Sequence, residues 1–165
     1  MSTRTRTIAW EDPVASFARA AELSGMEYLR ALMAGEIPPP PIAETLATWP
    51  VEVEDGRAVF ECEPAEFHYN PIGLVHGGLA ATLLDSAMGC AVQTRLEAGV
   101  GYSTLDLSVR YLRPMTRDTG TVRAKGAVVH LGRATATAEG RIVAAATGKL
   151  LATATTSCLV ARPPG

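Results

Sequence analysis

The feature that most constrains the fold is a long apolar segment that contains one carboxylate. From Gly77 to Thr94 the chain reads GGLAATLLDSAMGCAVQT, in which Asp85 is the one group that is charged near neutral pH. The segment predicts a helix from about Gly77 to Arg95 that is apolar on nearly every face. Because such a helix cannot lie on a protein surface, the rest of the chain has to wrap around it.

Segments with the two-residue period of a β-strand follow this helix, and we expect these strands to wrap around it. Apolar and polar side chains alternate at Leu105, Leu107, Val109 and Tyr111 against Thr104, Asp106, Ser108 and Arg110. Further strands are predicted at Gly120–Val129, Arg133–Ile142 and Lys149–Val160, and shorter ones at Val51–Val53 and Ala58–Glu63. Short turns join consecutive strands, which demands an antiparallel sheet. The predicted fold class is therefore α+β, with an antiparallel sheet wrapped around one long central α-helix.

The first forty residues are expected to form an arm of one helix or a helix pair that packs on this unit. Asp12-Pro13 is a typical helix start, and an apolar face continues to Gly35 although Gly25 interrupts it. The prolines at 38–41 predict a stiff, extended link. We therefore divide the chain into an arm with its linker at 1–41 and a main domain at 42–165. A surface for a partner subunit is the alternative role of the arm.

Composition is that of an ordinary globular protein and excludes several functions. The chain has 165 residues, of which 47% are hydrophobic and 19% charged, enough for one domain with a proper core. A net charge of −2 with scattered basic residues gives no reason to expect nucleic acid. No run is long enough to span a bilayer, and the start lacks the apolar core of a secretory signal, so we expect a cytoplasmic protein. The three cysteines have no metal-ligand spacing and are interpreted as free thiols, so no metal is expected.

A glycine-rich turn, NPIGLVHGG at residues 70–78, runs directly into the predicted helix. The first N–H groups of a helix have no intrahelical acceptor, so this turn is a natural site for a developing negative charge. A lone carboxylate in an apolar helix is costly unless it is paired or functional. Together, the turn and Asp85 suggest an oxyanion-binding site and a general base or nucleophile.

The spacing of these two features indicates a site shared between two chains. Gly77 and Asp85 are eight residues apart, roughly 12 Å of helix rise. Both would have to lie within about 3 Å of one reacting carbonyl group. Two antiparallel copies related by a two-fold axis satisfy this requirement, which predicts a catalytic dimer.

Each residue also has a purely structural interpretation. The glycines would allow close packing against the sheet, and Asp85 would be held by backbone or hydroxyl donors. His76 would be a packing or hydrogen-bonding residue, Asn70 an ordinary turn former, and Thr104 an ordinary strand residue.

The combination of these residues resembles the hotdog-fold acyl-CoA thioesterases, in the branch of the phenylacetate-pathway (PaaI-like) enzymes and their eukaryotic relatives. The resemblance rests on N-P-x-G-x-x-H-G-G with Asp nine residues after His76, and covers roughly Val51 to Val160. Three further motifs support it: Ser103-Thr104-Leu105-Asp106, Tyr111-Leu112-Arg113-Pro114 and Ala146-Thr147-Gly148-Lys149-Leu150-Leu151-Ala152. It implies the hotdog fold, a sheet curled around one long helix, here with an N-terminal helical extension.

The resemblance also implies catalytic roles. The Gly77 N–H would polarise the thioester carbonyl, and Asp85 of the other chain would attack the carbonyl or activate water. Asn70 would orient the substrate or the attacking water, and His76 would support the turn. Thr104 matches a serine of close relatives, with one inserted residue, and its hydroxyl would help to place the water.

For substrate binding, the resemblance implies a coenzyme A path over two surface segments, with Arg113 and Arg133 as phosphate contacts. The residues expected to bind substrate or coenzyme A are Gly78, Tyr111, Arg113, Pro114, His130, Gly132 and Arg133. An apolar acyl or aryl pocket is expected at Ala80, Ala81, Leu84 and Met88.

The predicted function is hydrolysis of a small or medium acyl- or aryl-CoA thioester to the free acid and CoA. No cofactor is expected, because coenzyme A is part of the substrate. The expected partner is a second copy of the chain, in a homodimer and, by resemblance, a dimer of dimers. The alternatives are an acyl-CoA hydratase or dehydratase on the same fold, and a non-catalytic acyl-CoA or lipid binder.

Overall fold

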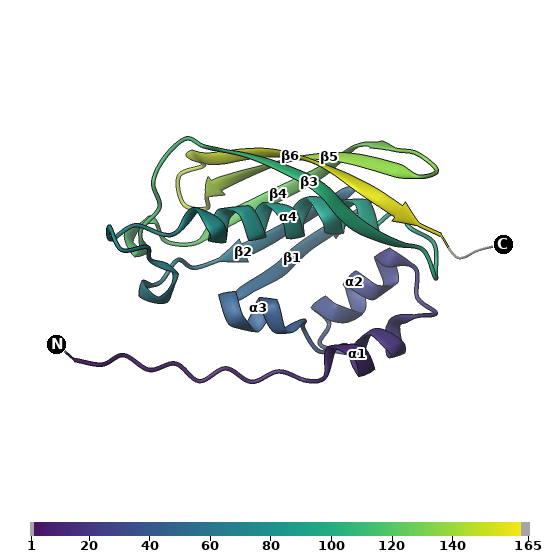
Figure 1. Ribbon diagram of the computed structural model, residues 1–165, viewed down its shortest axis with the longest axis horizontal. Coiled ribbons are helices and arrows are strands. Elements are labelled where there is room, and N and C mark those ends of the chain that lie inside the picture. The colour runs from purple at the N-terminus through teal and green to yellow at the C-terminus, as the bar shows by residue number, and fades with distance from the viewer. Residues whose placement is uncertain (1, 163–165) are drawn as a thin grey trace.

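The computed structural model describes residues 2–162, which form a curved antiparallel sheet around one central helix (Figure 1). The strands are β1 (Thr48–Glu54), β2 (Arg57–Cys62), β3 (Gly101–Tyr111), β4 (Val122–Leu131), β5 (Thr135–Ala144) and β6 (Leu150–Ala161). Their order in the sheet is β1-β2-β4-β5-β6-β3, and all neighbours are antiparallel. The central helix is α4 (Gly77–Gln93). The predicted α+β hotdog architecture is confirmed.

The core lies between α4 and the inner face of the sheet. Leu83, Leu84 and Met88 of α4 are fully buried. Gly126 of β4 lets the sheet approach the helix closely, because a Cβ at this position would lie 2.2 Å from the carbonyl oxygen of Ala87. The apolar faces of the helix are therefore satisfied by the sheet, as its composition requires.

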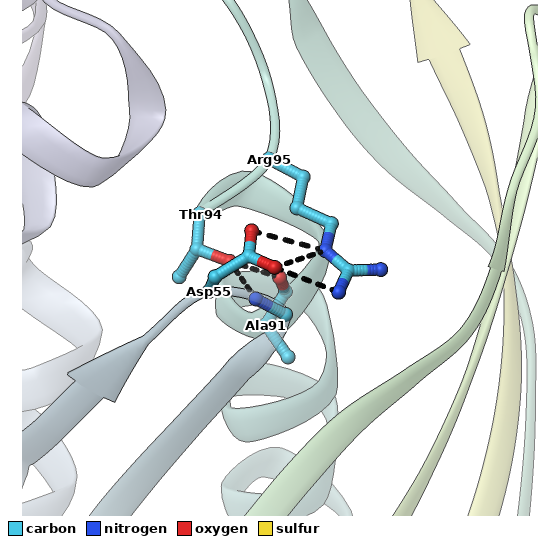
Figure 2. Close-up of polar contacts among 5 residues, drawn as sticks. Asp55, Ala91, Thr94 and Arg95 are labelled. Carbon is cyan, nitrogen blue, oxygen red and sulfur yellow. Dashed lines mark hydrogen bonds and ion pairs between the residues drawn. The ribbon is translucent and has the colours of Figure 1, made fainter.

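The C-terminal end of α4 is tied to the β1–β2 hairpin by a cluster of polar contacts (Figure 2). The Thr94 hydroxyl donates to the Ala91 carbonyl at 2.7 Å and accepts from the Gly56 N–H at 2.8 Å. The Arg95 guanidinium donates to both carboxylate oxygens of Asp55, the shortest bond being 2.8 Å. The hairpin turn is thereby fixed to the end of the helix.

A β-bulge in β3 changes the face on which its residues lie. The pairing with β6 shifts between Thr104 and Asp106, so Leu105 is an extra residue and is 58% exposed. An extra residue reverses the alternation of side chains along the strand. Thr104 therefore lies on the same side of the sheet as Leu107 and is half-buried, whereas Leu105 is exposed. The predicted alternation across 104–111 was therefore wrong at Thr104 and Leu105.

The N-terminal arm forms a pair of short helices, one of the two arrangements expected, and a third helix follows the linker. They are α1 (Pro13–Ala20), α2 (Gly25–Met33) and α3 (Pro41–Leu46). Ser24 caps α2 and exchanges hydrogen bonds with Glu27, which fixes a new helix start at the point where Gly25 interrupts the apolar pattern. Pro41 is the first residue of α3, so the extended link ends one residue earlier than predicted.

Two 3₁₀ turns, at Glu66–His68 and Arg117–Thr119, complete the elements of the described chain. Within residues 2–162, no helix combines the length and the apolar character needed to cross a membrane.

Candidate active site

Asp85 is held by the inward-facing hydroxyl of Thr104. The Thr104 Oγ1 donates to the Asp85 Oδ1 at 2.8 Å, and both residues are half-buried. This contact depends on the bulge at Leu105, because regular alternation with Leu107 would turn Thr104 away from α4. Among residues 2–162 no hydrogen bond is found to the other oxygen, Oδ2, so one side of the carboxylate is open.

Tyr102 and Cys90 lie beside this carboxylate, and the sequence interpretation did not include Tyr102. The ring packs against Gly89, where a Cβ would come within 2.4 Å of the tyrosine hydroxyl. Burial raises the pKa of the Cys90 thiol to about 12. Burial, with smaller contributions from nearby Cys90 and Asp85, raises the pKa of the Tyr102 hydroxyl well above its usual range. Both groups are therefore neutral near pH 7, and the thiol is a poor nucleophile. The signal available in the sequence was Gly89, a glycine inside a helix, which needs a close neighbour to explain it.

A cavity of about 220 Å³ opens beside Asp85, between α4 and the N-terminal helices. Thr82, Ser86 and Tyr102 line it together with residues of α2 and α3. None of the four residues predicted to line an acyl pocket, Ala80, Ala81, Leu84 and Met88, lines this cavity, and Ala80, Leu84 and Met88 are fully buried against the sheet. The reason is helical phase, because positions 82, 85 and 86 share the face that the sheet leaves uncovered.

Asn70 closes the loop that precedes α4. Its side-chain oxygen accepts the N–H groups of Ile72 and Leu74, each at 3.1 Å, and its own N–H donates to the Leu74 carbonyl at 2.8 Å. Gly73 completes the turn with a φ of 80°, a conformation that favours glycine. The structure therefore gives Asn70 a loop-holding role, and no hydrogen bond from its amide nitrogen is found among the described residues.

His76 distinguishes the two glycines of the turn. It is the N-cap of α4, and its Nδ1 accepts the N–H of Gly78 at 2.8 Å, which makes Nε2 the protonated nitrogen of the neutral ring. Gly77 is the first helical residue, and no acceptor for its N–H is found within residues 2–162. The Tyr111 ring lies where a Gly77 side chain would be, at 3.1 Å, and its hydroxyl donates to the Gly77 carbonyl. The open donor is therefore Gly77, not Gly78.

His68, which the sequence interpretation did not single out, supports the same turn. Its carbonyl accepts the His76 N–H at 2.8 Å, and its buried ring donates from Nε2 to the Leu46 carbonyl at 2.9 Å. The ring's Nδ1 accepts the Ala65 N–H. Burial lowers the pKa of His68, so the ring is neutral at pH 7. No periodicity or motif marks this residue, because its role depends on loops that meet in the fold.

One chain does not bring all the predicted residues together. The cavity beside Asp85 is lined by neither Gly77 nor Asn70. The two segments expected to bind coenzyme A lie at opposite ends of the sheet. Tyr111 pairs with Ala152, whereas the turn after His130 lies near Val160, whose N–H donates to the carbonyl of residue 134. These ends are roughly 25 Å apart along β6.

The basic residues of the two segments have different surroundings. Arg113 donates to the Leu150 carbonyl at 2.7 Å, with an exposed side chain, and Pro114 is exposed beside it. Arg133 and His130 are exposed, and Gly132 is half-buried, in the β4–β5 turn.

Within residues 2–162, no group of three or more His, Cys, Asp or Glu side chains is placed to hold a metal ion.

Curated relatives match parts of the chain. It is 28% identical to the 1,4-dihydroxy-2-naphthoyl-CoA hydrolase of Listeria monocytogenes over 98 residues, which cover 59% of this chain and 78% of the hydrolase. It is 34% identical to human acyl-coenzyme A thioesterase 13 over 39% of this chain and 45% of that enzyme. The chain thus spans less than half of the human relative. It is also 45% identical to a Halobacterium salinarum protein described as an esterase, over 41% of this chain and 44% of that protein.

The structural comparisons cover more of the chain than the curated relatives do, and a family model matches its central part. Residues 72–151 match the family described as the thioesterase superfamily. A phenylacetic acid degradation-related protein from Ralstonia eutropha is 31% identical, with a TM-score of 0.72 over 80% of this chain and 98% of that one. A variant of the phenylacetic acid degradation protein PaaI from Thermus thermophilus is 32% identical, with a TM-score of 0.66 over 75% of this chain and all of that one. The chain therefore belongs to the thioesterase superfamily of thioester hydrolases, in its PaaI-like, hotdog-fold branch.

Proposed function

We propose that the protein hydrolyses the thioester of a small or medium acyl- or aryl-CoA to the free acid and CoA. The observation that carries this function is the Asp85 carboxylate, fixed on one side by Thr104 and open on the other beside a cavity. The Listeria relative is named for an aryl-CoA thioester, which supports an acyl group of similar chemistry here.

Asp85 acts at the open oxygen. It takes a proton from a water molecule whose oxygen attacks the thioester carbonyl, or it attacks that carbonyl itself. In the first route the C–S bond breaks as the acid forms, and the proton held by Asp85 passes to the sulfur, which leaves as the thiol of CoA. In the second route the C–S bond breaks as a mixed anhydride forms on Asp85; water then hydrolyses the anhydride, which releases the acid, regenerates the carboxylate and supplies the proton of the thiol. Thr104 keeps the carboxylate oriented through Oδ1, which leaves Oδ2 directed at the reaction.

The oxyanion donor is the Gly77 N–H of a partner subunit. β3 is an edge strand of eleven residues without proline or lysine, the kind of edge that pairs with another strand. If two copies of β3 pair antiparallel about an axis near Ser108, Thr104 of one chain lies opposite the partner's Tyr111. Since Thr104 contacts Asp85 and Tyr111 contacts Gly77, this pairing brings the partner's Gly77 toward Asp85.

The same pairing accounts for the separated coenzyme A segments. An antiparallel seam brings the Tyr111–Pro114 segment of one subunit to the sheet end that carries the partner's His130–Arg133 turn. Arg113 and Arg133 then contribute guanidinium groups from two chains to the phosphates of one coenzyme A. Asn70 and His76 keep the Gly77 turn in shape, and Gly78 allows the close approach of the substrate.

The alternative functions receive less support from the geometry. An acyl-CoA hydratase would need an acid and a base close together, but the Nδ1 of His76 is used to cap α4 and Asp85 lies more than two helical turns away. A lipid binder would gain nothing from a half-buried carboxylate beside its cavity. We expect no metal or cofactor requirement and a cytoplasmic location.

The direct test is hydrolysis of acyl-CoA thioesters by the purified protein, followed through the released thiol. We expect turnover by the wild type and a loss of about 1,000-fold or more in kcat for Asp85→Asn, which preserves shape and removes the charge. Asp55→Asn is the matched control, because Asp55 is an exposed aspartate at the far end of α4. A fully active, folded Asp85→Asn protein would disprove the proposed role.

A further inference from the structure

We infer that the α2–α3 segment, residues 25–46, forms the wall of the acyl pocket and restricts the substrate to compact, uncharged acyl groups of about one ring or eight carbons. This inference rests on the proposed thioesterase function. Seven of the sixteen residues that line the cavity beside Asp85 come from this segment. Among them, Tyr28 and Leu32 belong to α2, Pro39 to the linker, and Ile42 to α3.

The α2–α3 segment is docked rigidly, so the pocket has a defined size. The Gly25 N–H donates to the Leu96 carbonyl at 2.9 Å, and a Cβ at Gly25 would lie 1.8 Å from the Gln93 carbonyl oxygen. Helix α2 therefore starts in direct backbone contact with the end of α4. Leu29 is fully buried, and Ile37 is only 5% exposed, which anchors the rest of the segment.

The volume and chemistry of the cavity limit the acyl group. An engineered apolar cavity of about 150 Å³ holds benzene, so 220 Å³ has room for a ring with a short spacer but not for a long alkyl chain. The lining includes no Arg, Lys or His, and Asp85 contributes a negative charge. An acyl group with a second carboxylate, such as succinyl, would be repelled and left unpaired.

The test is a selectivity profile with substitutions at two neighbouring positions of α2. Leu32 lines the cavity, whereas Met33 is 40% exposed and does not. The variants are Leu32→Trp, which fills the pocket, Leu32→Ala, which enlarges it, and Met33→Trp as the matched control. The panel is acetyl-, octanoyl-, phenylacetyl-, palmitoyl- and succinyl-CoA, with kcat/KM measured for each.

We expect the wild type to prefer octanoyl- or phenylacetyl-CoA. Leu32→Trp should lower kcat/KM for these two substrates by about tenfold or more while acetyl-CoA is little affected. Leu32→Ala should shift the preference toward palmitoyl-CoA, and Met33→Trp should match the wild type. A wild type that prefers palmitoyl- or succinyl-CoA, or a Leu32→Trp profile identical to that of Met33→Trp, would overturn the inference.

A separate measurement distinguishes this inference from the proposed function. If the wild type hydrolyses no acyl-CoA, the proposed function fails, and calorimetric binding of phenylacetate and octanoate then tests the pocket alone. Binding to the wild type and Met33→Trp but not to Leu32→Trp would sustain the pocket. Equal binding to all three proteins, or to none, would overturn it.

Discussion

The polar groups at the two ends of α4 differ in how completely they are hydrogen-bonded. At the C-terminal end, the Thr94 hydroxyl both donates and accepts, and Arg95 is paired with Asp55 through several hydrogen bonds. At the N-terminal end, His76 caps Gly78, but the Gly77 N–H has no acceptor among residues 2–162. A fully paired end stabilises the fold, whereas an open donor at the positive end of a helix is available to an anion. We therefore propose that the C-terminal end of α4 has a structural role and that its N-terminal end takes part in the reaction.

After Asp85→Asn, removing the open donor should have the largest effect. Gly77→Pro deletes the N–H, yet proline is favoured at the first helical position and His76 already has an extended conformation. We expect kcat to fall by about 100-fold or more, because one oxyanion donor is lost, with little change in the free energy of unfolding.

The control for this variant is Gly77→Ala, which keeps the N–H but also places a Cβ against the Tyr111 ring. If both variants lose the same activity, the steric effect explains the loss and the N–H is not the oxyanion donor.

The next largest effect is expected at Thr104. Thr104→Val preserves shape and removes the hydroxyl that donates to Asp85, so kcat/KM should fall by about tenfold. Thr104→Ser keeps a hydroxyl at the same position and should recover most of the activity. Steady-state kinetics on both variants checks this, and equal activity of the Val and Ser variants would show that the hydrogen bond does not orient the carboxylate.

At the paired end of the helix, the expected loss is of stability and not of activity. Thr94→Val leaves the buried Gly56 N–H without its acceptor, which should lower the free energy of unfolding by about 1–3 kcal/mol. Urea denaturation measures this change, and kcat should stay at the wild-type value. A large loss of kcat in a folded Thr94→Val protein would contradict the division of α4 into two kinds of end.

The smallest effect is expected from the exposed pair at the same end. The hydrogen bonds from Arg95 lower the pKa of Asp55 below its ordinary value. A lowered folded-state pKa means that the contribution is present above the unfolded pKa, about 3.9, and is lost as the pH falls through the folded pKa. Asp55→Asn should therefore lower Tm slightly at neutral pH and not at all in strong acid. A Tm difference that grows toward acid pH would contradict this sign.

Much of the fold followed from composition and periodicity. The wrapped helix was predictable because an apolar helix with one charge has few places to lie, and the strands because their alternation is local. The bulge at Leu105 was not, since an extra residue leaves the alternation of the sequence unbroken and appears only in the pairing with β6. That single residue decides whether Thr104 reaches Asp85.

The candidate site was predictable where it depends on spacing and unpredictable where it depends on packing. The distance between Gly77 and Asp85 follows from helix rise alone. The pocket wall does not, because the contact of Tyr28 and Leu32 with the free face of α4 depends on how α2 docks. His68 was missed for the same reason, since its partners come from separate loops.

If each active site takes Gly77 from one chain and Asp85 from its partner, two inactive variants should restore activity when they are mixed. Asp85→Asn and Gly77→Pro are unfolded together, refolded as a mixture, and assayed for acyl-CoA hydrolysis. A mixed dimer has one intact site, formed by Gly77 of the first variant and Asp85 of the second. Half of the dimers in an equimolar mixture are mixed, so the mixture should recover about a quarter of the wild-type activity. A mixture no more active than its parents would contradict it.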